Sequence, residues 1–175
     1  MGGRLSKAVL NKMFVDDLGS SYVVRGDVRD VPLAVSPSGC PGTVFKIYAF
    51  NCTNPVGGRT LDECKIQLIL PGQVRGTRGV LDDSDGCVTC IVGFAAYGDG
   101  KNGAWVIWET AMHRDFAYSA NLQVKSGDIL RAMTDGVFSV KKRKNGEIIV
   151  VADRDRLSDA MILRQEVDLE RLLEG

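Results

Sequence analysis

The spacing of apolar residues along the chain predicts three helices. The first helix is expected within residues 1–18. Apolar side chains recur there every three or four positions over residues 4–18, which is helical periodicity. Residues 157–173 show the same spacing. A shorter helix is expected over residues 126–134, near 126–135, with Ser126 as its N-cap and Gly136 just beyond its end. One helix therefore lies near each end of the chain and one precedes the last predicted strands.

Runs rich in β-branched and aromatic residues predict a sheet between the first and last helices. Asn145 and Gly146 stand between two alternating runs, which is the strongest short-range signal for a β-hairpin. The expected strands and extended segments are residues 20–25, 31–35, 43–53, 62–70, 87–94, 103–110, 137–142 and 147–152. The pattern predicts a single α+β domain over residues 1–175, with a mostly antiparallel mixed sheet of roughly six to eight strands over residues 20–152.

The composition agrees with one globular domain. The chain has 175 residues, of which 45% are hydrophobic and 25% are charged, and this mixture excludes a disordered or fibrous protein. It carries 22 Lys and Arg against 22 Asp and Glu, so the formal net charge is zero. A histone-like polycation is therefore excluded. Nucleic-acid binding is not, because a neutral chain can still separate its charges onto different faces.

The sequence indicates a cytoplasmic protein with reduced cysteines. No apolar run reaches the roughly 18 residues of a membrane span, and the N-terminal segment lacks the apolar core of a secretory signal. The five cysteines are an odd number without the spacing of a disulfide framework. Cys87 and Cys90 form a CxxC pair, but no second pair completes a zinc site, so we expect two small structural residues.

Glu63 and Lys65 form an E-x-K pattern on a predicted strand. In PD-(D/E)xK nucleases such a pair stands at a Mg²⁺ site, where the carboxylate holds the metal and the lysine positions the attacking water. This use needs a second acid, for which the candidates are Asp16, Asp27 and Asp30. The alternative is an exposed ion pair on an ordinary strand.

Three polar residues alternate with apolar ones just before the middle helix. Ser119, Asn121 and Gln123 would lie on one face of an extended segment. Asn and Gln side chains can pair with the edges of DNA bases, and Ser can contact bases or phosphates. The alternative is a polar solvent face. His113 lies upstream and has no G-x-S-x-G partner, so it does not indicate a Ser-His triad.

Two groups of cations lie in predicted loops. Arginines in Gly-rich loops can hold phosphates, although no Walker lysine follows them, and four consecutive cations at a hairpin tip suit a DNA backbone. The alternative for the hairpin is that its charges keep an edge strand soluble. The first group is Arg59, Arg75 and Arg78, and the second is Lys141, Lys142, Arg143 and Lys144.

The order of motifs from Phe45 to Gly136 resembles methylase-associated or endonuclease-associated domains of restriction–modification systems. An aromatic strand ending in Asn-x-Thr, a Gly-Gly loop with an Arg, an acidic strand, a Trp-containing strand (Trp108), a His and a Ser-x-x-x-Gln segment follow in that order. Cys64 stands where the family pattern has an aromatic residue, and Lys65 stands where it has an Arg. An Arg at position 65 would weaken the nuclease hypothesis, because a guanidinium stays charged near neutral pH and cannot transfer a proton. The matching positions are Asn51, Thr53, Gly57, Gly58, Arg59, Glu63, Lys65, Gln67, His113, Ser119 and Gln123.

The resemblance implies a domain that acts on or recognises DNA. The first reading is a DNA-recognition domain, or accessory protein of a restriction–modification or defence system, that is not catalytic by itself, needs no cofactor and binds double-stranded DNA. The second is a metal-dependent endonuclease that uses Glu63 and Lys65 with Mg²⁺. The third is an interaction subunit for a separate nuclease or methyltransferase chain, docked through residues 157–173. The residues expected at DNA are Arg59, Gln67, Arg75, Arg78, His113, Ser119, Asn121, Gln123, Lys141, Lys142, Arg143 and Lys144.

Overall fold

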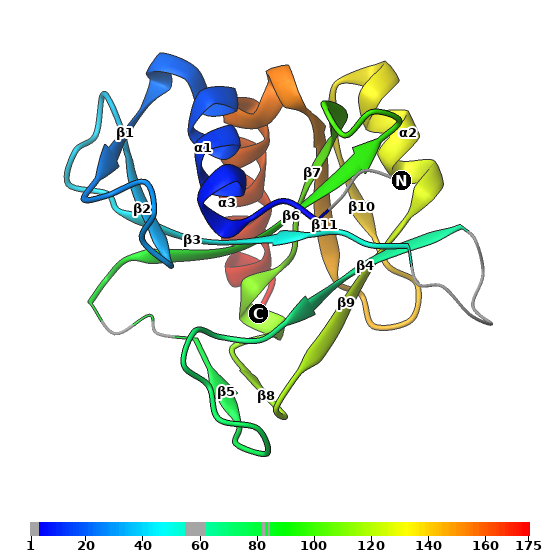
Figure 1. Cartoon of the computed structure of the whole chain (residues 1–175). Helices are drawn as coiled ribbons and strands as arrows, with labels where there is room; N and C mark the ends of the chain where they lie inside the picture. The colour runs from blue at the N-terminus through cyan, green and yellow to red at the C-terminus, as the bar shows by residue number, and fades with distance from the viewer. Residues whose placement is uncertain (1–3, 55–61, 82, 84) are drawn as a thin grey trace.

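The computed structural model describes residues 4–54, 62–81, 83 and 85–175. The chain begins with α1 (Lys7–Leu18), passes through nine strands to α2 (Ser126–Asp135), and ends with a hairpin and α3 (Leu157–Glu174), as Figure 1 shows. The strands are β1 (Tyr22–Arg25), β2 (Leu33–Pro37), β3 (Phe45–Asn51), β4 (Glu63–Leu68), β5 (Gly79–Val80), β6 (Val88–Tyr97), β7 (Asn102–Ile107), β8 (Asp115–Phe116), β9 (Ala120–Lys125), β10 (Val137–Lys141) and β11 (Ile148–Asp153).

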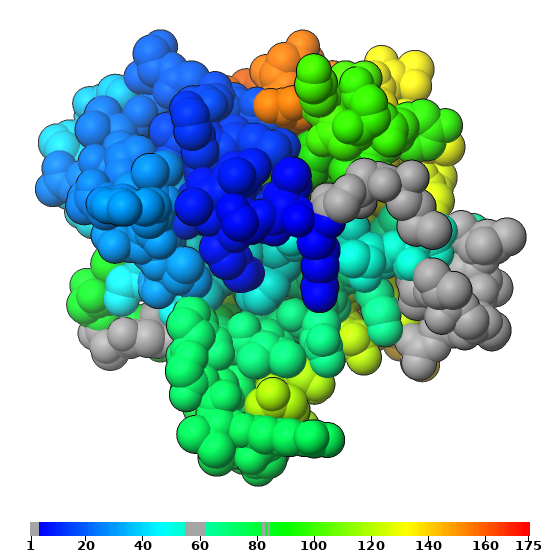
Figure 2. Space-filling model, viewed as in Figure 1, coloured from blue at the N-terminus to red at the C-terminus, as the bar shows by residue number. Residues whose placement is uncertain are grey.

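Seven strands form a central sheet in the order β1-β2-β3-β6-β7-β11-β10. β3 and β6 run parallel, whereas every other neighbouring pair is antiparallel. A parallel pair needs a long crossover, and here the crossover carries β4 and β5. These two strands pair elsewhere, β4 with β9 and β5 with β8. The segment that carries β5 projects from the body of the molecule (Figure 2).

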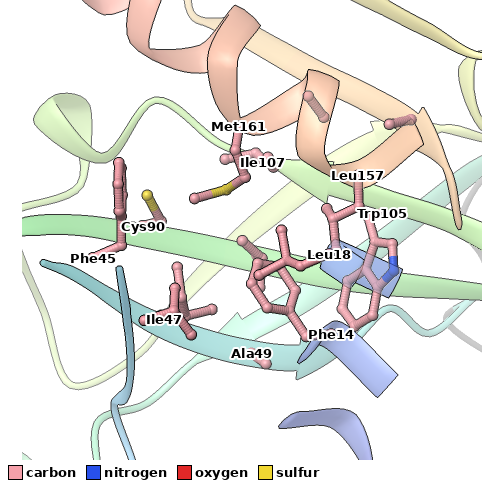
Figure 3. Close-up of a cluster of buried hydrophobic side chains, with 14 of the residues drawn as sticks. Phe14, Leu18, Phe45, Ile47, Ala49, Cys90, Trp105, Ile107, Leu157 and Met161 are labelled. Atoms are coloured by element: carbon pink, nitrogen blue, oxygen red, sulfur yellow. The ribbon is translucent and has the colours of Figure 1, made fainter. Parts of the chain in front are cut away.

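α1 and α3 cover one face of the central sheet. Phe14 of α1 packs edge-on against Trp105 of β7, with ring centroids 5.1 Å apart, and the Trp105 indole donates a hydrogen bond to Asp17 at 2.8 Å. Leu157 and Met161 of α3 are buried in the same cluster, which Figure 3 shows between the helices and the sheet. The apolar spacing seen in the sequence therefore faces this core only in part, because Val9 of α1 and Ile162 and Leu169 of α3 are exposed.

The β4–β9 pair and α2 cover the opposite face of the sheet. Ile66 of β4 and Leu122 of β9 pack against sheet residues such as Trp108 and Val106. The ribbon lies close to the sheet at Gly93, where an added Cβ would stand 2.9 Å from Cγ2 of Ile66 on β4. The central sheet thus separates a helical layer from a ribbon-and-helix layer.

The α+β class predicted from the sequence is confirmed, including the three helices and the hairpin. One local prediction is wrong. Ser126 is the first residue of α2 rather than its cap; the N-cap is Lys125, and no side chain caps that end. The Ser126 amide instead donates to the Asp62 carbonyl at 2.7 Å, which ties α2 to the start of β4. No helix in the described ranges has the length and apolar character needed to cross a membrane.

Candidate nucleic-acid interface

The β4–β9 ribbon places two rows of polar side chains on one outward face. Successive residues of a strand point to opposite faces, and the buried partners Ile66 and Leu122 define the inner face. On the outer face Lys65 lies opposite Gln123, and Gln67 lies opposite Asn121. The structure therefore joins the E-x-K strand and the Asn/Gln row, which are far apart in sequence, into a single surface.

The middle of this surface consists of side chains that have no partner among the described residues. No hydrogen bond or ion pair joins the side chains of Lys65, Gln67, Asn121 and Gln123 to another described residue. Gln67 and Asn121 are exposed, whereas Lys65 and Gln123 are half-buried. The amides and the ammonium group are thus free to bind a ligand.

At one end of the ribbon the charges are already paired. Lys125 contacts Glu63 at 2.6 Å and Asp62 at 3.3 Å, and its pKa is raised chiefly by the hydrogen bond to Glu63. Glu63 is therefore part of an ion pair across the ribbon. An ion pair was the alternative to a metal site that the sequence offered, but here Glu63 pairs with Lys125 of β9 and not with Lys65 of its own strand.

The turn between β10 and β11 carries the cationic run. Gly146 adopts a positive φ of 73°, which favours glycine, and its amide donates to the Lys142 carbonyl at 2.9 Å. Lys141, Arg143 and Lys144 are exposed, and none of them forms an ion pair with another described residue. Three of the four predicted cations are thus available to phosphates.

The fourth cation belongs to a buried network at the base of the hairpin. Glu147 is only 1% exposed. Its Oε2 atom lies 3.0 Å from Lys142 Nζ, and its Oε1 atom lies 2.6 Å from His113 Nε2. Burial by itself would raise the pKa of Glu147, but the His113 hydrogen bond and the Lys142 charge lower it overall. The network ties the segment after β7 to the hairpin, whose residues lie 34 positions later.

A cavity of about 640 Å³ separates the β9 edge of the ribbon from the hairpin. Its polar lining includes Asn121, Gln123, Asp128, Lys141 and Lys144, and the His113–Glu147 pair also reaches it. Apolar side chains of both strands complete the walls, namely Leu122, Val124, Val140 and Ile149. The cavity therefore joins the amide row to the cationic turn.

The other predicted residues lie outside this cavity. Arg75 and Arg78 are exposed in the loop before β5, and Arg78 pairs with Asp115 at 2.7 Å. Ser119 directly precedes β9 and does not line the cavity. Gln67 belongs to the outer ribbon face but borders a different hollow, beside Arg4 and Lys7. Gly57, Gly58 and Arg59 lie outside the described residues.

The motif residues near the end of β3 have structural roles. The Asn51 side chain exchanges two hydrogen bonds with the Leu5 backbone, at 3.0 and 2.9 Å, and so ties the start of α1 to the sheet. Thr53 pairs with Lys65 through backbone hydrogen bonds of 2.8 and 2.9 Å. This bridge links the central sheet to the ribbon.

The second acid expected for the nuclease reading does not lie beside Glu63. Asp16 is on α1, and Asp27 and Asp30 are in the turn after β1, which the Asn11 side chain of α1 holds through the Asp30 carbonyl. α1 packs on the opposite face of the sheet from the ribbon. Asp128 shares the cavity with Glu63, but within the described ranges no three His, Cys, Asp or Glu side chains form a group that could hold a metal ion.

Sequence reasoning missed Glu147, Lys125 and Asp128. Glu147 directly follows the Asn-Gly turn, where a carboxylate is usually solvent-exposed, and only its distant partner His113 shows that it is buried. Asp128 lies in the first turn of α2, where acids are common, and burial raises its pKa. The Asn-Gly signal predicted the turn from the sequence. The pairings of Glu147 and Lys125 join residues far apart in the chain, so only the three-dimensional structure shows them.

One protein family matches the chain over most of the fold. The model of the family described as Methylase-associated X1 matches residues 43–161, about two-thirds of the chain, from just before β3 into α3. No curated protein and no solved structure matches the chain. The family match confirms the resemblance to methylase-associated domains and relates the chain to restriction–modification. The chain belongs to the Methylase-associated X1 family.

Proposed function

We propose that the chain recognises double-stranded DNA through the outer face of the β4–β9 ribbon and the cationic β10–β11 turn, and does not cleave DNA by itself. The observation that carries the proposal is the pairing of Lys65 with Gln123 and of Gln67 with Asn121 on one outward face. Four side chains that can contact bases or phosphates lie together there, and none has a partner in the part of the chain that the structure describes.

A two-stranded ribbon is a suitable shape for the major groove of DNA. The groove is about 12 Å wide and admits either a helix or a two-stranded ribbon. Several DNA-binding proteins read bases with strands in this way. Asn and Gln side chains form paired hydrogen bonds with adenine, and Lys contacts guanine. The ribbon of this chain carries these residue types on the face turned away from the core.

The cationic turn supports the second part of the proposal. Contacts to phosphates position a protein on the duplex, whereas contacts to base edges supply sequence preference. Lys141, Arg143 and Lys144 are exposed beside the ribbon and carry no ion pair with the part of the chain that the structure describes. Zero net charge is compatible with this arrangement, because a neutral chain can still place several cations together on one turn.

A triple substitution tests the role of the turn. Replacing Lys141, Arg143 and Lys144 with Ala should weaken duplex binding and reduce the slope of log affinity against log salt by about 2–3, because each phosphate contact contributes about 0.9. Lys142 is left in place because it pairs with buried Glu147. Fluorescence anisotropy of labelled duplex across a salt series measures both quantities.

A charge-matched variant controls for non-specific electrostatics. Lys12, Arg25 and Arg29 lie on α1, on β1 and in the turn after β1. Replacing these three with Ala removes the same formal charge but should leave the salt slope unchanged. An equal loss of slope in both triple variants would contradict a specific role for the hairpin.

The proposal includes a partner chain that performs chemistry on DNA. The family is methylase-associated by its description, which favours a methyltransferase as this partner, with a nuclease as the alternative. Such a recognition domain would work in the cytoplasm, where cysteines stay reduced. Co-purification with each candidate chain, with and without duplex DNA, tests the association.

A further inference from the structure

We propose that the cavity between β9 and the β10–β11 hairpin takes a single unpaired nucleotide, with its base against Gln123, Asn121 and Asp128 and its phosphate at Lys141 and Lys144. This inference rests on the proposed function and names the chemistry that the same surface would recognise. The nucleotide could come from a duplex that extrudes one base or from the free pool, and the two sources are separated below.

The size and walls of the cavity suit a base. Its volume of about 640 Å³ lies within the range of roughly 300–1,000 Å³ that is common for small-molecule sites. Val140 and Ile149 contribute apolar surface from the hairpin side, and the β9 residues Leu122 and Val124 contribute it from the ribbon side. Apolar walls with a few hydrogen-bonding groups between them match the faces and the edges of a planar heterocycle.

The pairing of the lining groups shows which ones remain for a ligand. Glu63 with Lys125, and Glu147 with His113 and Lys142, already satisfy one another. The Asn145 side chain accepts a hydrogen bond from the Glu147 amide at 3.1 Å. Asn121, Gln123 and Asp128 have no side-chain hydrogen bond to another described residue. Two amides and one carboxyl can together donate to ring nitrogens and carbonyls and accept from an exocyclic amino group.

The cations complete a nucleotide site rather than a site for a base alone. Lys141 and Lys144 line the cavity from the hairpin and carry no ion pair within the described ranges. The amide groups of Asn121 and Gln123 come from β9, on the opposite wall. A base on one side and an anionic phosphate on the other reproduce this polarity. The Asp128 carboxyl favours the bases with an exocyclic amino group, which are adenine, cytosine and guanine, over thymine, which has none.

Duplexes with one unpaired nucleotide test the proposal. The full chain is titrated with three labelled duplexes of the same flanking sequence, carrying an unpaired adenine, an unpaired thymine or no unpaired base. An already unpaired base avoids the cost of extrusion, so the adenine duplex should bind about tenfold more tightly than the fully paired one. The thymine duplex should gain less.

Two glutamines of the ribbon provide matched variants. Gln123→Ala should abolish the preference for the unpaired adenine, because Gln123 lines the cavity. Gln67→Ala should weaken binding of all three duplexes to the same extent and so retain the preference, because Gln67 lies on the outer face but borders a different hollow. Thermal unfolding of both variants confirms that the ribbon remains folded.

Competition by deoxyadenosine monophosphate identifies the source of the nucleotide. Displacement that depends on Gln123 supports a site open to free nucleotides, and no displacement together with a Gln123-dependent preference for unpaired adenine supports a site for extruded bases. Equal binding of all three duplexes, with no Gln123-dependent binding of the mononucleotide, would overturn the inference while leaving DNA recognition intact. Absence of binding to every duplex would instead contradict the proposed function.

Discussion

The position of the cationic turn depends on the buried carboxylate of Glu147. It is nearly inaccessible to water, yet it accepts contacts from His113 and Lys142, and the Lys142 amide donates to its backbone carbonyl at 2.7 Å. A buried charge is tolerated only when it is paired, and here both oxygens have partners. The pairing holds the hairpin against the segment after β7 and leaves the tip free for phosphates.

Loss of the Glu147 charge should destabilise the protein in a pH-dependent way. Glu147→Gln should lower the free energy of unfolding by about 2 kcal/mol at pH 7, because the ion pair with Lys142 and the hydrogen bond between His113 and a charged carboxylate are lost. The pKa of Glu147 is lowered in the folded state, so its contribution is present above its ordinary pKa and disappears as the pH falls below about 4.5.

Urea unfolding at pH 7 and near pH 3 measures this difference. The gap between the native protein and Glu147→Gln should shrink at the lower pH. Glu166→Gln on the exposed side of α3 makes the same chemical change without a buried partner and should have little effect. A gap that stays constant between the two pH values would contradict the ionic role of Glu147.

At the scale of elements, the β4–β9 ribbon could be predicted only in part. The E-x-K strand and the alternating Ser119, Asn121 and Gln123 row were both recognised, and Asn121 and Gln123 do share a face of β9. Their pairing was not recognised, because the two strands are separated by a long stretch of chain and local patterns carry no register. Ser119 lies just outside the strand, where the Tyr118 carbonyl accepts a hydrogen bond from Gln73.

The pairing of β4 with β9 predicts that charge on the ribbon controls DNA affinity. Gln67→Glu places an anion on the outer face opposite Asn121, where it should repel phosphates and weaken duplex binding by about fivefold or more at low salt. Gln165→Glu makes the same change on an exposed position of α3, which packs on the other side of the central sheet.

The two variants are compared by anisotropy with the same labelled duplex. Gln165→Glu should bind like the native chain. If both variants lost affinity equally, net charge rather than the ribbon would govern binding. If neither lost affinity, the outer face of the ribbon would not be at the DNA.

At the scale of the whole molecule, the central sheet separates two layers with different roles. α1 and α3 bury one face, while the ribbon, α2 and the hairpin surround the candidate interface on the other side (Figure 1). Periodicity and turn signals predicted the helices, most strands and the α+β class from the sequence. The sheet order could not be predicted, because the parallel β3–β6 pair arises from a crossover whose strands pair elsewhere.

The central claim is that this layer binds duplex DNA without cutting it. Its most direct test is a titration of labelled duplex with the full chain in the presence of Mg²⁺ at several salt concentrations, followed by a denaturing gel. We expect affinity that falls with salt with a slope of about −3 or steeper, as three phosphate contacts require, and intact strands. The absence of salt-dependent binding at the lowest salt would contradict DNA recognition, and cut strands would contradict the non-catalytic role.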